Sequence, residues 1–287
     1  GLAGDDLLSG GLGNDYIDGG AGSDTASYSE KTTAVTVDFK NNTASTSVET
    51  DTLLSIENAI GGSAKDIFKM NEDNITNTID GQGNDDTVSY EYYTSGVKVN
   101  LSTSEFQDVQ TGDSDKILAI ENLIGSQGAD TIMGSSSNNT IVLGAGNDTF
   151  IAGTDSNNDA TLDVWSDDGS DYINGGDGSG DWIDYSIITD DANALTKGIE
   201  VSLDSSNEAN ISVRGQSGFD TVVNIEHISA TQDNDSIQGD DQNNSILGNA
   251  GDDIILGGAG FDYLEGNDGT DTLLGGSGTD TLLGGSG

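Results

Sequence analysis

Aspartate recurs at one position of a nine-residue pattern, and this regularity is the feature of the sequence that could bind metal ions. Calcium accepts roughly six to eight oxygen ligands and combines carboxylates with backbone carbonyls. We therefore expect the aspartate of each copy to be a calcium ligand. Fourteen copies carry Asp at their sixth position: Asp6, Asp15, Asp24, Asp66, Asp86, Asp130, Asp148, Asp171, Asp181, Asp235, Asp253, Asp262, Asp271 and Asp280. Three copies carry Asn there and keep an oxygen without the charge, so we expect weaker or doubtful sites at Asn77, Asn139 and Asn244.

Glycine and one apolar residue complete the pattern around each aspartate. Gly at positions one, two and four permits positive φ, so that the turn can fold its carbonyls inward. Position eight is apolar in all seventeen copies, from Leu8 to Leu282. This predicts a six-residue turn and a three-residue strand with one inward side chain. One such unit cannot bury that side chain alone, so the units must stack. The alternative is a series of solvated turns that bind no ion.

Consecutive copies form three strict blocks, at 1–27, 125–151 and 230–287. Looser copies lie at 61–69, 72–89 and 166–184, the last with one additional glycine, Gly180. Units such as GGLGNDYID, GGAGFDYLE and GGSGTDTLL resemble the RTX, or haemolysin-type, calcium-binding nonapeptide. The resemblance implies an all-β fold, an elongated parallel β-roll (a β-helix or solenoid) with two units per turn and calcium ions between turns two units apart.

This arrangement predicts which position-six residues lie together. One edge of the last block should hold Asp235, Asp253 and Asp271, and the other edge Asn244, Asp262 and Asp280. In the other strict blocks, Asp6 should face Asp24, and Asp130 should face Asp148.

Three longer segments, at 28–60, 90–124 and 185–229, lie between the repeats and resemble one another. Each opens on a tyrosine (Tyr28, Tyr90 or Tyr185), continues with an alternating run (VTVDF, VKVNL or IEVSL), and ends on DTLLSIENAIGG, DKILAIENLIGS or DTVVNIEHISA. Alternation indicates strands with one buried face, so we interpret the segments as wider coils of a single solenoid over 1–287. A shorter excursion at 152–165 is predicted as a loop or an irregular calcium site around Asp155, Asp159 and Asp163.

The charge and composition exclude several classes of function. The chain has 51 acidic and eight basic residues and a net charge of −43, which repels nucleic acid and anionic membranes. It has no Cys, so disulfides, thiolate catalysis and cysteine-based zinc sites are excluded. No apolar run approaches the roughly 18 residues of a spanning helix, and no membrane insertion is expected. Without cations such a chain is expected to be disordered.

No motif of an enzyme is evident. His227 is the only histidine and replaces the asparagine of the sibling motifs, Asn58 and Asn122. The sequence has neither a GxSxG elbow nor an HExxH motif, and carboxylates are too numerous to single out a catalytic pair. Of the two tryptophans, Trp165 and Trp182, the second occupies position seven and could stack on a sugar, but a tryptophan that covers a seam of the roll is the favoured interpretation. We therefore predict that the chain is not an enzyme.

Together these features predict a calcium-binding structural and secretion module of a large exported bacterial protein, of the adhesin-like kind. The resemblance implies secretion by type I machinery and an extracellular or cell-surface location. The chain begins and ends inside a repeat, which predicts a piece of a longer protein. An accessory domain of a secreted protease, lipase or polysaccharide-modifying enzyme, or a module that binds a polysaccharide, are the alternatives. Position three never carries Thr, which argues against an ice-binding surface.

Overall fold

The structure is a computed structural model of the chain. It describes residues 1–73, 75–135, 137–151, 171–177, 179–186, 198–203, 209–213 and 219–287. These residues form strands and turns without any helix, so none of them belongs to a helix that could cross a membrane. The predicted excursion at 152–165, with Trp165, lies outside the described residues. The all-β prediction is confirmed.

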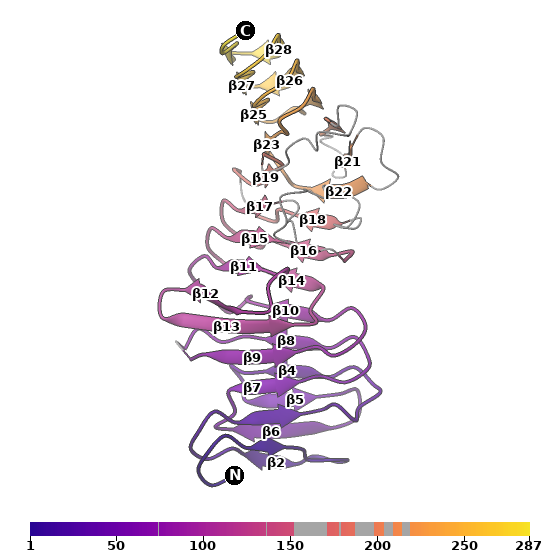
Figure 1. Ribbon diagram of the computed structural model, residues 1–287, viewed down its shortest axis with the longest axis vertical. Helices are drawn as coiled ribbons and strands as arrows, with labels where there is room; N and C mark the ends of the chain where they lie inside the picture. Colours follow the sequence, from indigo (N-terminus) through magenta and orange to yellow (C-terminus); the bar gives the residue numbers. More distant parts are fainter. Residues whose placement is uncertain are drawn as a thin grey trace. The chain divides into compact units, whose positions relative to one another are not determined.

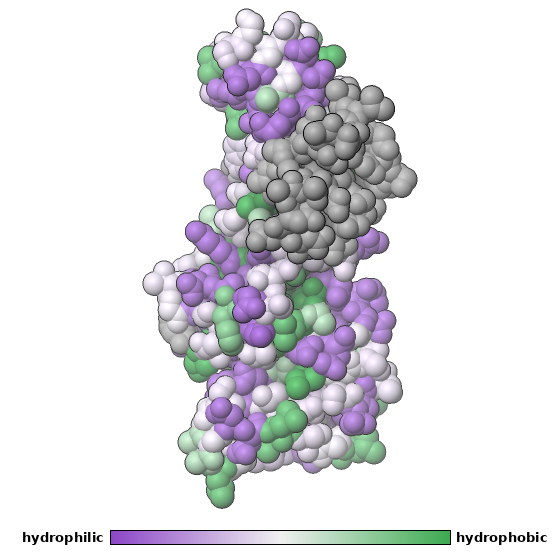
Figure 2. Space-filling model, viewed as in Figure 1, coloured by the Kyte–Doolittle hydropathy of each residue, from purple (hydrophilic) through white to green (hydrophobic). Residues whose placement is uncertain are grey.

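The chain divides into two compact units, Gly1–Gly128 and Ala129–Gly287, and each is described by itself. That the whole of 1–287 forms one continuous solenoid stays a prediction. Hydrophilic residues spread over the visible face of each unit, and hydrophobic residues form small separate groups (Figure 2).

The first unit contains fourteen strands in hydrogen-bonded layers (Figure 1). They are β1 (Leu7–Leu8), β2 (Tyr16–Asp18), β3 (Thr25–Ser27), β4 (Thr36–Asp38), β5 (Thr43–Ser45), β6 (Thr50–Leu54), β7 (Asn58–Ile60), β8 (Ile67–Lys69), β9 (Asn77–Asp80), β10 (Thr87–Ser89), β11 (Lys98–Asn100), β12 (Phe106–Gln110), β13 (Asp113–Leu118) and β14 (Asn122–Ile124). One sheet has the order β1-β3-β7-β9-β13-β12, and the other runs β2-β6-β5-β4-β8-β10-β14.

The second unit contains the remaining strands. They are β15 (Thr131–Met133), β16 (Thr140–Val142), β17 (Thr149–Ile151), β18 (Tyr172–Asn174), β19 (Trp182–Asp184), β20 (Ile199–Ser202), β21 (Ala209–Val213), β22 (Phe219–Val223), β23 (His227–Ser229), β24 (Ser236–Gln238), β25 (Ser245–Leu247), β26 (Ile254–Gly260), β27 (Tyr263–Glu265), β28 (Thr272–Gly278) and β29 (Thr281–Leu283). Their two sheets have the orders β16-β18-β22-β21-β20-β24-β26-β28 and β15-β17-β19-β23-β25-β27-β29.

In the last repeat block, each strand pairs in parallel with the strand two units further along the chain. β24 pairs with β26 and β26 with β28 in one sheet, while β25 pairs with β27 and β27 with β29 in the other. Ile237 therefore lies beside Ile255, and Ile255 beside Leu273, an offset of two nonapeptides. This is the predicted roll with two units per turn.

The longer segments, which we call the longer coils, contain antiparallel strands in addition to strands that pair in parallel with the repeats. β5 pairs antiparallel with both β4 and β6, β12 with β13, and β21 with both β20 and β22. The alternating runs of the sequence became β4, β11 and β20. β5 and β21 lie inside their sheets, between β4 and β6 and between β20 and β22, whereas β12 ends its sheet.

The core of each unit is a column of position-eight side chains. Phe68, Ile79 and Val88 are fully buried in the first unit, as are Phe150 and Ile183 in the second. Burial decreases in the last coil, where 42% of Leu282 is exposed. The inward side chain predicted for the nonapeptide is thus confirmed inside each stack, and burial is incomplete in the first and last coils, at Leu8, Leu273 and Leu282.

Candidate functional site

Hydrogen bonds between successive coils join the position-six residues into ladders. The N–H of Asp235 donates to Oδ1 of Asp253 at 2.8 Å, and the N–H of Asp253 donates to Oδ1 of Asp271 at 3.0 Å. The parallel register causes this, because it places each position-six residue over its equivalent in the next coil. The predicted stacking of both edges and of the other strict blocks is confirmed, since the same bond joins Asn244 to Asp262, Asp262 to Asp280, Asp6 to Asp24 and Asp130 to Asp148.

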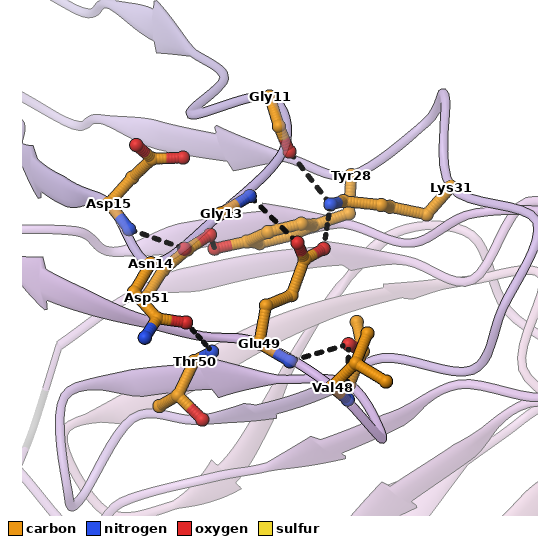
Figure 3. Close-up of polar contacts among 11 residues, drawn as sticks. Gly11, Gly13, Asn14, Asp15, Tyr28, Lys31, Val48, Glu49, Thr50 and Asp51 are labelled. Carbon is orange, nitrogen blue, oxygen red and sulfur yellow. Dashed lines mark hydrogen bonds and ion pairs between the residues drawn. The ribbon is translucent and has the colours of Figure 1, made fainter.

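Carboxylates of the longer coils continue the ladders, and the nonapeptide pattern did not identify them. The N–H of Asp15 donates to Oδ1 of Asp51 at 2.8 Å, and the N–H of Asp24 donates to Oε2 of Glu57 at 2.8 Å (Figure 3 shows the first). Equivalent bonds run from Asp86 to Glu121, from Asp171 to Asp220 and from Asp181 to Glu226. A signal for them was present in the sequence, because each closing motif holds an Asp followed six residues later by a Glu.

The second carboxylate oxygen of many position-six aspartates is buried and has no hydrogen-bond partner. Asp24, Asp86 and Asp148 are fully buried, yet Oδ2 of each is unpaired. Burying a carboxylate oxygen without a partner costs free energy, and binding of a cation or a proton would remove that cost. Among the described residues, the position-six aspartates with such an oxygen are Asp6, Asp15, Asp24, Asp86, Asp148, Asp181, Asp253, Asp262 and Asp271.

The unpaired oxygen points back into its own turn, beside the position-one glycine. A Cβ added to Gly248 would lie 2.3 Å from Oδ2 of Asp253 and 2.9 Å from the carbonyl oxygen of Gly266 in the next coil. Gly257 is placed in the same way, 2.4 Å from Oδ2 of Asp262. Glycine at position one of these turns therefore leaves open a space bordered by a carboxylate oxygen and a backbone carbonyl. The turn of Asp148 is an exception, with Leu143 at position one.

Burial also changes the protonation of these groups. It raises the pKa of Asp253 to about 7, and the neighbouring carboxylate of Asp271 raises it further, while the N–H of Asp235 opposes the change. Burial likewise raises the pKa of Asp86 to about 7 and that of Asp148 to about 6. The ionised form of each carboxylate is thus poorly stabilised by the protein itself.

Basic side chains do not neutralise these turns. In the described part of the chain, the ion pairs are Lys31–Glu49, Lys65–Asp85 and Lys69–Glu91, and none involves a position-six residue. Figure 3 shows the first of them beside the Asp15 turn, where Nζ of Lys31 also donates to the carbonyl of Gly11.

The donor set fits calcium. It consists of hard oxygens, from a carboxylate and from backbone carbonyls, which calcium accepts in a flexible geometry. No three His, Cys, Asp or Glu side chains converge on one point among the described residues. An ion in such a turn would therefore be held by an aspartate together with backbone carbonyls. Metal binding by the fourteen predicted aspartates itself stays a prediction.

Four position-six residues differ from this pattern, because a donor of their own turn reaches the side-chain oxygen. Oδ2 of Asp66 accepts the N–H of Gly62 at 2.5 Å. Oδ2 of Asp235 accepts the N–H of Thr231 at 3.0 Å and also its hydroxyl at 3.1 Å. Two of the predicted weak positions behave in the same way, since Oδ1 of Asn139 accepts the N–H of Ser135 and Oδ1 of Asn244 accepts that of Asp240. The third, Asn77, donates from Nδ2 to the carbonyl of Glu57.

His227 has a structural position at a seam of the second unit. Its Nδ1 accepts the N–H of Ser245 at 2.9 Å, and its ring lies 4.9 Å from that of Trp182. Asn58 of the sibling motif has the equivalent role, since its Oδ1 accepts the N–H of Thr78. Burial lowers the pKa of His227. The geometry supports the interpretation of both aromatic residues as parts of a seam.

Comparison with known proteins agrees with the geometry. A search of the curated proteins found no match for the chain. The family model of the RTX calcium-binding nonapeptide repeat matches it four times, at residues 1–26, 124–158, 229–264 and 257–287. The chain therefore carries RTX calcium-binding nonapeptide repeats, folded as the mostly parallel β-structure that the resemblance implied.

Proposed function

We propose that this chain is a calcium-folded structural module of a secreted, adhesin-like protein, exported by type I machinery to the cell surface or the extracellular medium. It is a module without enzymatic activity. The observation that carries the proposal is the buried, unpaired Oδ2 of the position-six aspartates, which lies beside a backbone carbonyl of the next coil.

Calcium would act by converting repulsion between coils into a shared contact. Each coil places one aspartate over another, as with Asp253 over Asp271, and the whole chain has a net charge of −43. At the low calcium concentration of a cytosol, the like charges keep the chain extended, a form suited to export through a narrow channel. At about a millimolar, the range in which extracellular modules bind calcium, the ions neutralise the turns and the coils stack.

Circular dichroism tests this proposal. The far-UV β-sheet signal should be weak in excess chelator, rise steeply with calcium and disappear again when chelator is added. Magnesium should substitute poorly because it requires a stricter octahedral geometry, and sodium chloride at equal ionic strength should have little effect because it only screens charge. A chelated sample with the full β-sheet signal would contradict the proposal.

A further inference from the structure

Most turns of the described repeats adopt one of two conformations, which differ at position two. In nine complete turns the position-two residue has a positive φ, and eight of these turns contain an aspartate with a buried, unpaired Oδ2. We call these eight the open turns; their position-two residues are Gly11, Gly20, Gln82, Gly144, Gly176, Asn249, Gly258 and Asn267. The ninth turn, with Gly276 and Asp280, belongs to the last coil, and Asp280 has no buried unpaired oxygen. The remaining unpaired position-six aspartate, Asp6, lies in the first turn of the sequence.

In the other conformation, position two is not left-handed and its N–H donates to the position-six side chain. We call these the closed turns; they contain Asp66, Asn139, Asp235 and Asn244, with Gly62, Ser135, Thr231 and Asp240 as the donors. The two conformations are exclusive in the described repeats: every turn with this bond lacks the positive φ, and every open turn lacks the bond.

The residue types at positions two and four explain the difference. Open turns have Gly or Asn at position four, as in Gly251 and Gly260, where φ is +123° in both cases. Closed turns have Ala64, Ser137, Asp233 or Gln242 at position four. Thr231, at position two of a closed turn, is β-branched, and such residues strongly disfavour the left-handed region. A side chain at these positions thus holds the turn in the form in which its own N–H binds the carboxylate.

In all three longer coils a tyrosine hydroxyl donates to a carboxylate, and in two of them no oxygen of that carboxylate is left unpaired. The hydroxyl of Tyr28 donates to Oδ2 of Asp51 at 3.1 Å, while Oδ1 accepts the N–H of Asp15 (Figure 3). The hydroxyl of Tyr185 donates to Oδ2 of Asp220 at 2.9 Å, and Oδ1 accepts an N–H from the preceding coil at 3.1 Å. Neither Asp51 nor Asp220 keeps an unpaired oxygen. We call these two contacts the tyrosine caps. In the remaining longer coil, the hydroxyl of Tyr90 donates to Oδ2 of Asp115 at 2.8 Å, but Oδ1 has no partner.

We propose that the closed turns and the tyrosine caps hold their acidic or amide side chains without calcium, so that calcium binds only at the open turns. Protein donors take the place of the ion wherever the second oxygen is already hydrogen-bonded. This inference rests on the proposed calcium-binding function and assigns that function to a subset of the repeats.

A matched pair on one ladder tests the proposal. Asp235, in a closed turn, and Asp253, in an open turn, lie in successive coils and are joined by a hydrogen bond. Calcium bound per chain is measured by equilibrium dialysis at saturating calcium. Asp253→Asn should bind at least one ion fewer than the wild type, and Asp235→Asn should bind the same number. Equal losses in the two variants would overturn the proposal, whereas a wild type that binds no calcium would instead refute the proposed function.

A gain of binding avoids dependence on variants that fold poorly. Ala230→Gly, Thr231→Asn and Asp233→Gly together give the closed turn of Asp235 glycine at position one and the residue types of an open turn at positions two and four. The triple variant should bind one more ion than the wild type. An unchanged number in a variant with the wild-type circular dichroism spectrum would show that turn conformation does not select the sites.

The tyrosine caps are tested with a conservative change. Tyr185→Phe removes the hydroxyl from Asp220 and should raise the calcium midpoint of folding at least twofold without reducing the number of ions bound. Tyr263→Phe is the control, because Tyr263 is exposed and its hydroxyl donates to Glu265 two residues away. A loss of one ion in Tyr185→Phe, or a midpoint equal to that of the control, would overturn the assignment.

Discussion

A methyl group beside one carboxylate should remove one calcium ion from the folded protein. Gly266 occupies position one of an open turn, and its φ is not in the left-handed region, so its backbone tolerates alanine. The new Cβ would lie 2.3 Å from Oδ2 of Asp271, whereas real Cβ contacts are essentially never under 3.0 Å. The carboxylate must therefore move by about 0.7 Å, the difference between those distances, at an overpacking cost of about 1–3 kcal/mol.

A matched control separates this effect from a simple loss of stability. A Cβ on Gly62 would also make a 2.3 Å contact, but with the backbone carbonyl of Lys31 and in a closed turn. Because a backbone carbonyl cannot move aside as easily as a carboxylate, Gly62→Ala should lower stability by at least as much as Gly266→Ala without removing an ion. Gly83→Ala, where a Cβ meets nothing within 4 Å, should be close to neutral.

The assay is urea unfolding at a series of calcium concentrations. The free energy of unfolding rises with the logarithm of calcium concentration, and the slope reports the number of ions bound by the folded state. Gly266→Ala should lower this slope by about one ion, and Gly62→Ala and Gly83→Ala should leave it unchanged. An unchanged slope in Gly266→Ala, or an equal decrease in Gly62→Ala, would refute the assignment of the ion to the space beside position one.

Three further predictions concern pH, the core and the histidine. Burial raises the folded-state pKa of Asp253 to about 7 and that of Asp148 to about 6, above the value of about 3.9 in an unfolded chain. Because the folded state holds these protons more tightly, the calcium-free fold is stabilised at low pH and loses that stability as the pH rises through 6–7. In chelator, acidification from pH 8 to pH 5 should therefore increase the β-sheet signal, and a decrease would contradict these shifts. Phe150→Ala should lower the free energy of unfolding in calcium by about 3–5 kcal/mol in a urea titration, because Phe150 is fully buried. A loss below about 1 kcal/mol would contradict this, because it would mean that neighbouring side chains move to fill the cavity. His227→Ala should cost about 1 kcal/mol or less, since one hydrogen bond to Ser245 is lost, and hydrolase, epimerase and lyase assays should detect no activity in either protein; turnover abolished by the change would contradict the structural role.

The repeating part of the fold could be predicted from the sequence because its period is visible residue by residue. Each position recurs every nine residues. The apolar residue at position eight identifies the inward side chain, and the aspartate at position six identifies the side chain that stacks on the next coil. The predicted contacts between Asp6 and Asp24 and between Asp130 and Asp148 follow from this register alone. A parallel stack of identical units leaves few other arrangements that bury the apolar column.

The ladder carboxylates of the longer coils could not be predicted in the same way, because variable spacings separate the partners. Asp15 and Asp51 are 36 residues apart, and Asp181 and Glu226 are 45 residues apart, whereas repeat partners are 18 apart. The additional residues between these partners form the antiparallel strands. The opening tyrosines and closing aspartates were visible as shared features, but their contact depends on how each coil closes in space.

The closed turns could not be predicted either, because they have the same residue at position six as the open turns or an asparagine in its place. Asp66 and Asp235 match the aspartate position as well as Asp253 does, so position six alone predicts the same chemistry for all three. The difference lies in the residues at positions two and four, which decide whether a backbone N–H or an empty space meets Oδ2. Conformational preference at two neighbouring positions thus changes what the same carboxylate can bind.

Perfect repetition explains why some turns need an ion and others do not. When a unit stacks on an identical unit, each side chain lies over its own copy, so an aspartate such as Asp253 meets another aspartate, Asp271. No protein donor can be introduced at that point without changing the repeat, and the neutralising charge must come from solution. A longer coil breaks the period and brings a different residue to the carboxylate, as Tyr28 reaches Asp51 from 23 residues away. In this view the irregular coils, like the closed turns, are places where the chain itself supplies the contact that calcium makes at the open turns.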